Sequence, residues 1–323
     1  MKRSINIGVF DPKLICQASP YCGDQIFAKG LEANSYEVTR FDYRATNDPN
    51  NQLLEIANKI KPELFWFGKC ERISPETIGI LKSRFPESIF CKWCADVRDE
   101  PTEHDMRHNQ FIDYFFGTFG GDYLQKHLLP SMKGVASILA FTDSDFYHKM
   151  DVSDEYKSDI LWTGRKGFGD NSLRNEIIDH LSGTKQYKVK IAGLNDWLGD
   201  PQYQYYINGT KIGIGSNSFN RVKYSSDRLG NYMACGTFYL LQYFKGLEEV
   251  FQRGKEIDWF EDIEEMDSKI EYYLTHEKER EYIAMRGQET ILNFFDYKPL
   301  VFNLLKIIET GKSLYPWDDV YVN

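Results

Sequence analysis

Residues 225–251, SSDRLGNYMACGTFYLLQYFKGLEEVF, contain the helix–strand unit around which the rest of the chain is expected to fold. The Ser-Ser-Asp sequence at 225–227 favours an N-cap, and the apolar spacing after it predicts a helix. Gly236 is expected to end this helix, because glycine tolerates the left-handed conformation of a C-cap. The apolar run 237–241 then predicts a buried strand, and a second helix is expected to begin near Gly246. Ligands of open α/β sheets bind where helix amino ends meet strand carboxyl ends, so this unit is a candidate ligand-binding wall; an ordinary α/β unit is the alternative.

The same alternation of strands and helices extends in both directions along the chain. Short apolar runs bounded by Gly, Pro and polar residues predict strands, and segments with helical spacing lie between them. This alternation is typical of parallel, doubly wound sheets. The other predicted strands cover residues 5–10, 36–43, 64–67, 88–93, 111–119, 136–141, 160–163, 187–192 and 211–215, and helices at 261–274, 277–295 and 297–309 follow the last strand.

The length of the chain and one polar segment predict two domains. A chain of 323 residues can form two domains of ordinary size. The segment 151–157, DVSDEYK, reads as the linker between a first domain, 1–150, and a second domain, 151–296.

Composition restricts the class of protein. Apolar residues make up 42% of the chain and charged residues 27%, which is typical of a folded globular protein. The net charge of −9 disfavours a broad nucleic-acid-binding surface, although a local basic groove stays open. There is no apolar run of membrane-spanning length and no signal-peptide core, so a cytoplasmic location is expected. Six cysteines in a chain this long do not suggest a disulfide framework, and Cys91 and Cys94 are expected to be buried thiols.

Five short motifs in the second half of the chain occur together. They are Arg228-x-x-Asn231, Ala234-Cys235-Gly236, Glu248-x-x-Phe251, Trp259-Phe260 and Tyr272-Tyr273-Leu274. Together they resemble the donor half of the spore-maturation (CgeB-like) glycosyltransferases, which are GT-B enzymes related to the group-1 glycosyltransferases. The resemblance extends from about residue 159 to the last helices, with a looser similarity in the first half. It implies an α/β GT-B fold with two Rossmann-like, doubly wound domains facing a cleft, and a C-terminal segment, 297–323, that crosses back to the first domain.

The loop 164–169, GRKGFG, is the first candidate donor site. Its glycines allow a diphosphate to approach the backbone, the helix that follows favours an anion, and two cations can neutralise it. The spacing is neither that of a Walker loop nor that of a G-x-G-x-x-G fingerprint, so an ordinary strand–helix turn is the alternative. The resemblance implies that Gly164 and Arg165 bind the donor phosphates, and Lys166 is the second candidate cation.

Further donor residues follow from the resemblance and from positions at strand ends. Many retaining group-1 enzymes have a Glu-x7-Glu pair whose second Glu binds the donor ribose, whereas here Lys223 and Asn231 hold these positions. An asparagine still hydrogen-bonds a ribose hydroxyl, but without charge, which leaves the stereochemical outcome open. The candidate donor residues are Gly193 and Trp197 near the nucleotide base, Ser216 and Asn217 at a strand end, and Ser225, Arg228 and Asn231 around the start of the helix after them.

Candidate acceptor residues follow the apolar run 89–94. Asp96 is expected at the carboxyl end of that strand, where it would act as the catalytic base or bind an acceptor hydroxyl. Arg98 would hold an anionic group of the acceptor, and His104 is the second candidate base. A solvated, salt-bridged loop is the alternative. His104 and His108 lie four residues apart, but no third metal ligand is apparent, so no metal site is expected.

These observations predict a glycosyltransferase. An acceptor hydroxyl attacks the anomeric carbon of a nucleotide sugar, UDP- or GDP-linked, while the nucleoside diphosphate leaves; no cofactor is expected. The acceptor is a glycan, a small molecule or a nucleic acid. Two alternatives stay open: a phage-type glycosyltransferase that acts on modified DNA bases, and a non-catalytic nucleotide- or sugar-binding protein, for which Asn231 is the main argument.

Activity is predicted to be independent of divalent metal ions. No Asp-x-Asp pair is expected in a position to hold a divalent cation beside the donor phosphates, and the basic loop 164–169 offers a substitute. Turnover of the correct nucleotide sugar should therefore be unchanged after treatment with EDTA. A strict requirement for added Mn²⁺ or Mg²⁺ would contradict this prediction.

Overall fold

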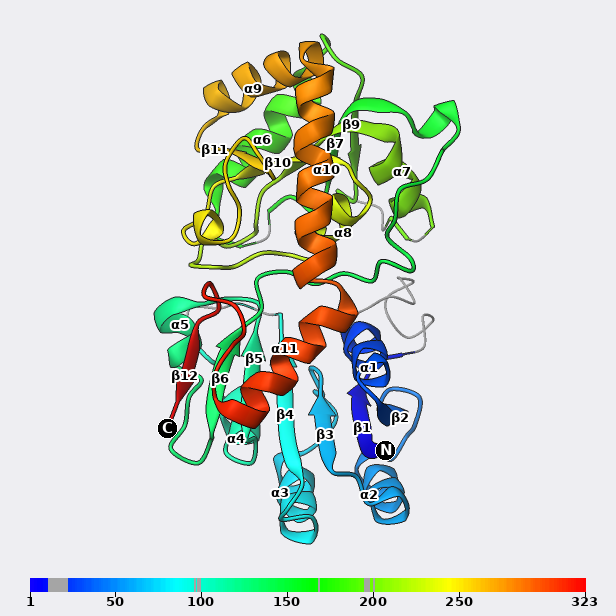
Figure 1. The fold of residues 1–323 in the computed structure, drawn as a ribbon, viewed down its shortest axis with the longest axis vertical. Helices are drawn as coiled ribbons and strands as arrows, with labels where there is room; N and C mark the ends of the chain where they lie inside the picture. Colours follow the sequence, from blue (N-terminus) through cyan, green and yellow to red (C-terminus); the bar gives the residue numbers. More distant parts are fainter. Residues whose placement is uncertain (11–22, 96, 98–99, 168, 195–197, 200) are drawn as a thin grey trace. The chain divides into compact units, whose positions relative to one another are not determined.

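The protein consists of two compact units, which are described separately. The computed structural model describes residues 1–10, 23–95, 97, 100–167, 169–194, 198–199 and 201–323. Unit 1 comprises Met1–Leu139 and Tyr297–Asn323, and unit 2 comprises Ala140–Asp296 (Figure 1). Residues 140–150, which the sequence placed in the first domain, belong to unit 2.

Unit 1 is built on a seven-stranded sheet with the order β12-β6-β5-β4-β3-β1-β2. Six strands are parallel, and only the C-terminal strand, drawn in red in Figure 1, pairs antiparallel with its neighbour. The strands are β1 (Lys2–Gly8), β2 (Tyr36–Asp42), β3 (Leu64–Phe67), β4 (Ile89–Cys94), β5 (Tyr114–Gly117), β6 (Gly134–Ser137) and β12 (Val320–Val322).

The helices of unit 1 connect these strands and include the C-terminal helix. Helix α11 packs against α1 at Gly30, where the β-carbon of any larger residue would overlap Val301. The last long helix therefore completes the hydrophobic core of the unit that contains the N-terminus. The helices are α1 (Gly23–Ala33), α2 (Pro49–Ile60), α3 (Pro75–Arg84), α4 (Glu103–Asn109), α5 (Gly121–Gln125) and α11 (Tyr297–Thr310).

Unit 2 is built on a five-stranded, all-parallel sheet with the order β11-β10-β9-β7-β8. Its core contains Trp162, Leu240 and Phe260 from the strands and Ile178 and Ile270 from the helices. The strands are β7 (Ser158–Thr163), β8 (Val189–Ala192), β9 (Thr210–Gly215), β10 (Phe238–Gln242) and β11 (Asp258–Phe260). The helices are α6 (Ser172–Gly183), α7 (Gln202–Gly209), α8 (Arg228–Ala234), α9 (Ile263–Thr275) and α10 (Glu277–Phe294), with 3-10 turns η1 (Asp154–Tyr156) and η2 (Leu247–Glu249).

The two parallel sheets confirm the predicted α/β fold with two Rossmann-like, doubly wound halves. One prediction in the 225–251 stretch is wrong. The helix expected near Gly246 is only the 3-10 turn η2, in which the Glu248 carboxylate accepts the Gly246 N–H at 2.9 Å. Gly236 does end α8 as predicted, with a φ of 69°.

The two ends of unit 2 lie side by side in its own structure. Thr142 and Asp296 form an isolated parallel bridge, and the Thr142 N–H donates to the Phe295 carbonyl at 3.0 Å. The Asp296 carboxylate also accepts from the backbone N–H and the hydroxyl of Ser144, at 2.9 and 2.8 Å. Unit 2 is therefore inserted into the sequence of unit 1, and the first and last segments of unit 2 contact each other.

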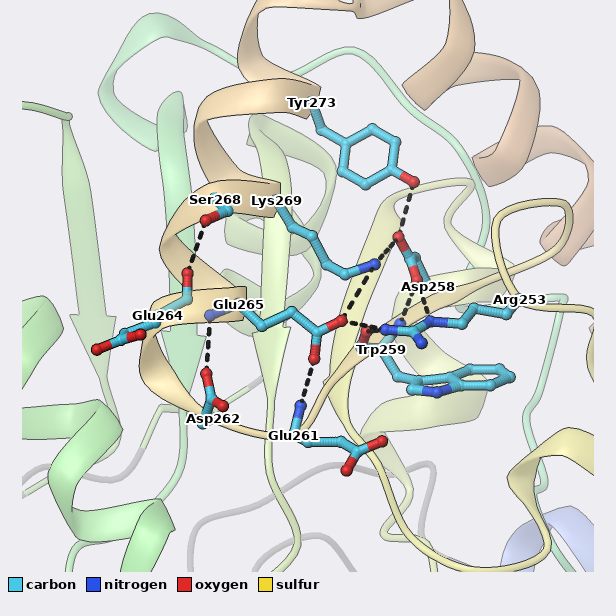
Figure 2. Close-up of polar contacts among 10 residues, drawn as sticks. All are labelled: Arg253, Asp258, Trp259, Glu261, Asp262, Glu264, Glu265, Ser268, Lys269 and Tyr273. Atoms are coloured by element: carbon cyan, nitrogen blue, oxygen red, sulfur yellow. Dashed lines mark hydrogen bonds and ion pairs between the residues drawn. The ribbon is translucent and has the colours of Figure 1, made fainter.

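A buried carboxylate joins β11 to α9 (Figure 2). The Asp258 side chain is 4% exposed and accepts from Lys269 Nζ at 2.5 Å, the Tyr273 hydroxyl at 2.8 Å and Arg253 Nε at 3.2 Å. Arg253 Nη2 also donates to the Trp259 carbonyl at 2.9 Å, and the guanidinium lies over the Trp259 ring, 5.3 Å from its centre. Trp259 and Tyr273, each from one of the sequence motifs, thus belong to a structural network.

Replacing Asp258 by alanine should lower the free energy of unfolding by about 3–5 kcal/mol, because it leaves two cations and a hydroxyl without their buried partner. Urea denaturation monitored by circular dichroism measures the change. Glu264→Ala, at an exposed carboxylate one turn of α9 before Ser268, is the control and should change the free energy by less than about 0.5 kcal/mol. Equal stability of the two variants would contradict this assignment.

Unit 1 contains two buried histidines beside a buried lysine. Lys92 on β4 is 1% exposed and pairs with Asp105 at 3.0 Å. Burial, together with the Lys92 charge, lowers the pKa of His108 to about 3 and that of His127 to about 4. Both rings are therefore neutral in the folded protein at pH values where an unfolded histidine, with a pKa of about 6.5, takes up a proton.

These histidines should make unit 1 sensitive to acid. Their folded pKa values lie below the unfolded value, so their contribution to stability is present above about pH 6.5 and is lost as the pH falls towards their folded pKa values. Each contributes a slope of up to about 1.4 kcal/mol per pH unit in that window. The change of the free energy of unfolding with pH, measured by urea denaturation at several pH values, should be smaller in His108→Gln than in the wild type. It should stay unchanged in His148→Gln, at an exposed histidine. Equal slopes in the wild type and His108→Gln would contradict the assignment.

Candidate functional site

The carboxyl edge of the unit 2 sheet brings together several of the residues selected from the sequence. Gly164 follows β7, Gly193 follows β8, Ser216 follows β9, and Gln242 ends β10. All four strands are parallel, so these residues lie at the same edge, where open α/β sheets bind ligands. The Gly164 N–H donates to the Ala192 carbonyl at 3.0 Å, which joins the first two strand ends.

Two arginines converge on Gly164. A β-carbon at this position would lie 2.5 Å from Nη2 of Arg174 and 3.5 Å from Nη1 of Arg228. The φ of Gly164 is 126°, a conformation that other residues rarely adopt. Only glycine therefore leaves room for both guanidinium groups beside the end of β7.

Arg174, in the first turn of α6, is held rigidly. Its side chain donates to the Arg165 carbonyl from Nε at 3.2 Å and from Nη2 at 3.0 Å, and its Nη1 donates to the Ser216 carbonyl. The guanidinium also stacks over Trp162 at 4.9 Å, and the residue is 2% exposed. Burial, followed by the Arg228 charge, lowers the pKa of Arg174 to about 10.

Arg228 begins α8 and supplies the second positive charge. Burial favours its neutral form, but Tyr239 and Asp227 outweigh burial and raise its pKa. Burial raises the pKa of Tyr239 to about 12, against the opposing charges of Arg228 and Arg174. Among the residues that the structure describes, neither arginine forms an ion pair with a carboxylate. The site therefore holds two adjacent positive charges, which an anion would neutralise.

A polar network lies beside the arginines. Asn171 Nδ2 donates to the Gln242 side-chain oxygen at 2.8 Å, to the Asn217 carbonyl at 2.9 Å and to the Ser216 hydroxyl at 3.2 Å. The Ser216 hydroxyl donates to the same Gln242 oxygen at 2.6 Å. Asn217 is 5% exposed, and its Nδ2 donates to the Tyr224 carbonyl at 2.6 Å. These bonds fix the loops that follow β7, β9 and β10 relative to one another.

The loop after β7 folds onto the loop after β9, and its two cations lie at the surface. A β-carbon at Gly169, whose φ is 88°, would overlap the Ser218 carbonyl. Arg165 is exposed, and its carbonyl oxygen accepts from Arg174. Lys166 is also exposed and forms an ion pair with Asp179 of α6. Its ammonium group is thus paired with a carboxylate of the helix that follows the loop.

The residues around α8 do not cap it as the sequence predicted. Asp227 occupies the N-cap position without a side-chain hydrogen bond to the helix. The Ser225 hydroxyl donates to the Ser226 carbonyl at 3.1 Å, and the Ser226 N–H donates to Asn217 Oδ1 at 3.3 Å. The Ser-Ser-Asp sequence therefore connects the helix to the loop after β9.

The two positions of the group-1 acidic pair are occupied differently. Asn231 is 3% exposed, and its Oδ1 accepts from the Thr142 hydroxyl at 3.5 Å. Lys223 is 5% exposed, has a φ of 51° and pairs with Glu249 at 2.7 Å. Asn231 thus contacts the first segment of unit 2.

Most of the acceptor candidates cannot be placed. Asp96 and Arg98, with Trp197 of the donor set, lie outside the described residues. His104 is exposed on α4, with its ring 4.1 Å from that of His108, and burial and the Lys92 charge lower its pKa. It is therefore a neutral, accessible imidazole at neutral pH.

The sequence analysis missed Arg174. The signal was an arginine in the first turn of a helix that directly follows a glycine-rich loop, a position from which a long side chain returns to the loop. Within the described part of the chain, no group of three or more His, Cys, Asp or Glu side chains is arranged to hold a metal ion. No helix among the same residues is long and apolar enough to cross a membrane. Cys91 and Cys94 are buried free thiols, as predicted.

Comparison of the sequence identifies a family that matches part of the chain. Residues 172–306 match the family described as glycosyl transferase-like, which covers less than half of the chain, from α6 into α11. The match includes Arg174 and Arg228 and agrees with the predicted transfer of a sugar. No curated protein sequence matches this chain.

Solved structures are similar over nearly the whole chain. Anabaena Alr3699/HepE in complex with UDP has a TM-score of 0.60 at 10% identity, covering 96% of this chain and 100% of that one. Sucrose-phosphate synthase from Thermosynechococcus elongatus has a TM-score of 0.61 at 11% identity, covering 96% and 99%. A glycosyltransferase from Rickettsia africae has a TM-score of 0.60 at 13% identity, covering 95% and 98%. The fold of this chain is thus the GT-B fold of two Rossmann-like domains.

Proposed function

We propose that the protein is a glycosyltransferase that binds the diphosphate of a nucleotide sugar at Gly164, between Arg174 and Arg228. The observation that carries this proposal is the convergence of two arginines on one glycine without a carboxylate partner. Two adjacent guanidinium groups repel each other, and the lowered pKa of Arg174 reflects this in part. A diphosphate would relieve the repulsion and accept charge-assisted hydrogen bonds from both side chains.

The position of the two arginines fits the chemistry of glycosyl transfer. As the bond from the anomeric carbon to the diphosphate breaks, negative charge builds up on the leaving oxygen. Fixed cations stabilise this charge without reorganisation, and Arg174 is fixed by three hydrogen bonds and a tryptophan ring. In this proposal the arginines, together with Arg165, perform the task that a metal ion performs in other transferases.

The finer parts of the proposal concern the two substrates. We assign the donor to unit 2 and the acceptor to unit 1, as in the CgeB-like enzymes that the sequence resembles. One solved structure of similar fold is a complex with UDP and another a complex with UDP-glucose, which supports a UDP-hexose as the first donor to test. The network of Asn171, Ser216 and Gln242 would then offer hydroxyl and amide groups beside the phosphates.

Nucleotide binding should depend on Arg228. A charge-assisted hydrogen bond is worth about 1.5–3 kcal/mol, so Arg228→Ala should weaken the binding of the best nucleoside diphosphate at least about tenfold. The ligand is selected by a thermal-shift panel of UDP, GDP, TDP, ADP and CMP, with their sugars, and the affinity is measured by calorimetry. Arg286→Ala, at an exposed arginine of α10 paired with Glu289, is the control and should bind normally. Equal affinity of the wild type and Arg228→Ala would contradict the proposed site.

A further inference from the structure

The two arginines beside Gly164 are held in different ways. Arg174 is buried and donates three hydrogen bonds to backbone carbonyl groups. Arg228 is half-buried, and no carbonyl group of the described residues accepts a hydrogen bond from its side chain. An arginine loses conformational entropy when it binds an anion, so one that is already ordered binds more tightly. Neighbouring side chains are therefore the groups that can order Arg228.

Tyr239 on β10 brings its hydroxyl group to the carboxyl edge of the unit 2 sheet. A β-carbon at Gly215, the last residue of β9, would lie 2.1 Å from this hydroxyl oxygen. A β-carbon at Gly213 of the same strand would lie 2.3 Å from the Tyr232 ring and 3.2 Å from the Tyr239 ring. The two glycines of β9 thus leave the space that the two tyrosine side chains occupy.

The Tyr239 ring is fixed by its contact with Tyr232. The two rings stack with their centres 4.8 Å apart, and both residues are buried. Tyr232 lies on α8 one turn after Arg228, on the same face of the helix. Its hydroxyl shares a hydrogen bond of 3.0 Å with the hydroxyl of Thr163, the residue directly before Gly164. The tyrosine stack therefore connects the start of α8 to the end of β7, where the two arginines meet.

Tyr239 and Arg228 interact directly. Burial opposes the charge of Arg228, and Tyr239 is the largest of the influences that raise the pKa of this arginine against burial. Burial raises the pKa of Tyr239 to about 12, against the charges of both arginines and the hydrogen bond with Arg228. The phenol is therefore neutral at physiological pH, and its oxygen is an acceptor for the guanidinium.

We propose that Tyr239 is a positioning residue of the diphosphate site: its hydroxyl accepts a hydrogen bond from Arg228 and holds the guanidinium towards Gly164. The inference rests on the proposed function, because Arg228, and not Tyr239, would contact the phosphates. A guanidinium has five N–H donors, so one bond to a phenol leaves donors for an anion. Tyr239 thus orders the half-buried arginine before the nucleotide arrives, as the backbone carbonyl groups order Arg174.

The first test is Tyr239→Phe, which keeps the ring and removes the hydroxyl. The probe is the nucleoside diphosphate selected by the thermal-shift panel described above, with UDP tested first. Its affinity, measured by calorimetry, should fall about two- to tenfold, the effect of losing one hydrogen bond. A folded Tyr239→Phe variant that binds the diphosphate as tightly as the wild type overturns the inference.

A double-mutant cycle tests whether Tyr239 acts through Arg228. In the Arg228→Ala background, Tyr239→Phe should cause no further loss of affinity for the diphosphate, because the arginine that it orders is absent. A purely structural effect of the hydroxyl would weaken binding by the same factor in both backgrounds. Such additive losses overturn the inference.

Tyr273→Phe is the matched control for a loss of stability. It also removes the hydroxyl of a buried tyrosine of unit 2, the one that donates to Asp258 at 2.8 Å. This variant should have a lower melting temperature than the wild type and an unchanged affinity for the diphosphate. A loss of affinity in Tyr273→Phe equal to that in Tyr239→Phe overturns the inference, because any buried hydroxyl would then have the same effect.

Gly215→Ala is a second variant, which does not depend on the folding of Tyr239→Phe. Its methyl group would occupy the place of the Tyr239 hydroxyl, so it should weaken diphosphate binding in the wild type but not in the Arg228→Ala background. Unchanged affinity in Gly215→Ala overturns the inference. A wild type that binds no nucleoside diphosphate overturns the proposed function and the role of Tyr239 with it. Weakened binding in Arg228→Ala together with normal binding in Tyr239→Phe overturns only the role of Tyr239.

Discussion

The hydrogen bonds of Arg174 hold the carboxyl edge of the unit 2 sheet together. Its guanidinium donates to carbonyl groups of the loops after β7 and β9, which the side chain of Asn171 also joins. The cost of burying this cation is offset by three hydrogen bonds to backbone carbonyl groups and by the Trp162 ring, a type of contact worth about 0.5–2 kcal/mol. Because the charge is buried beside Arg228, the strand ends carry two neighbouring cations, of which Arg228 is stabilised by the nearby Asp227 carboxylate. The same side chain thus fixes the conformation of the loops and supplies a positive charge to the candidate site.

Most of the fold could be predicted from the sequence, because its periodicity is local and strong. The run LFWF at Leu64–Phe67 and the long amphipathic helices α9, α10 and α11 appear where the spacing indicated. The predictions fail where tertiary contacts determine the local structure. At Gly246 the residues LEEV have helical propensity, but Glu248 folds back to the Gly246 N–H, and the buried Lys223 side chain lies against the glycine. The three residues of β12 are too few to show a period, and only the exposed edge of β6 makes them a strand.

The candidate site was only partly predictable, for a related reason. The sequence showed which residues follow each strand, so Gly164, Gly193, Ser216 and Arg228 could be selected in advance. It could not show where a flexible cation points. Lys166 in the loop pairs with Asp179 of the following helix α6, whereas Arg174 of that helix turns back towards the glycine loop.

The joined ends of unit 2 have a consequence for the biogenesis of the protein. Unit 1 needs α11 and β12 to cover α1 and the edge of β6, yet the ribosome makes these elements only after all of Ala140–Asp296. Domains generally fold as units during synthesis, so unit 2 can close through Thr142 and Asp296 while unit 1 still exposes apolar surface. The edge of β6 therefore stays unpaired in the nascent chain while unit 2 is synthesised. During that interval the exposed apolar surface of unit 1 is what a chaperone would protect, although residues 1–139 are synthesised before unit 2.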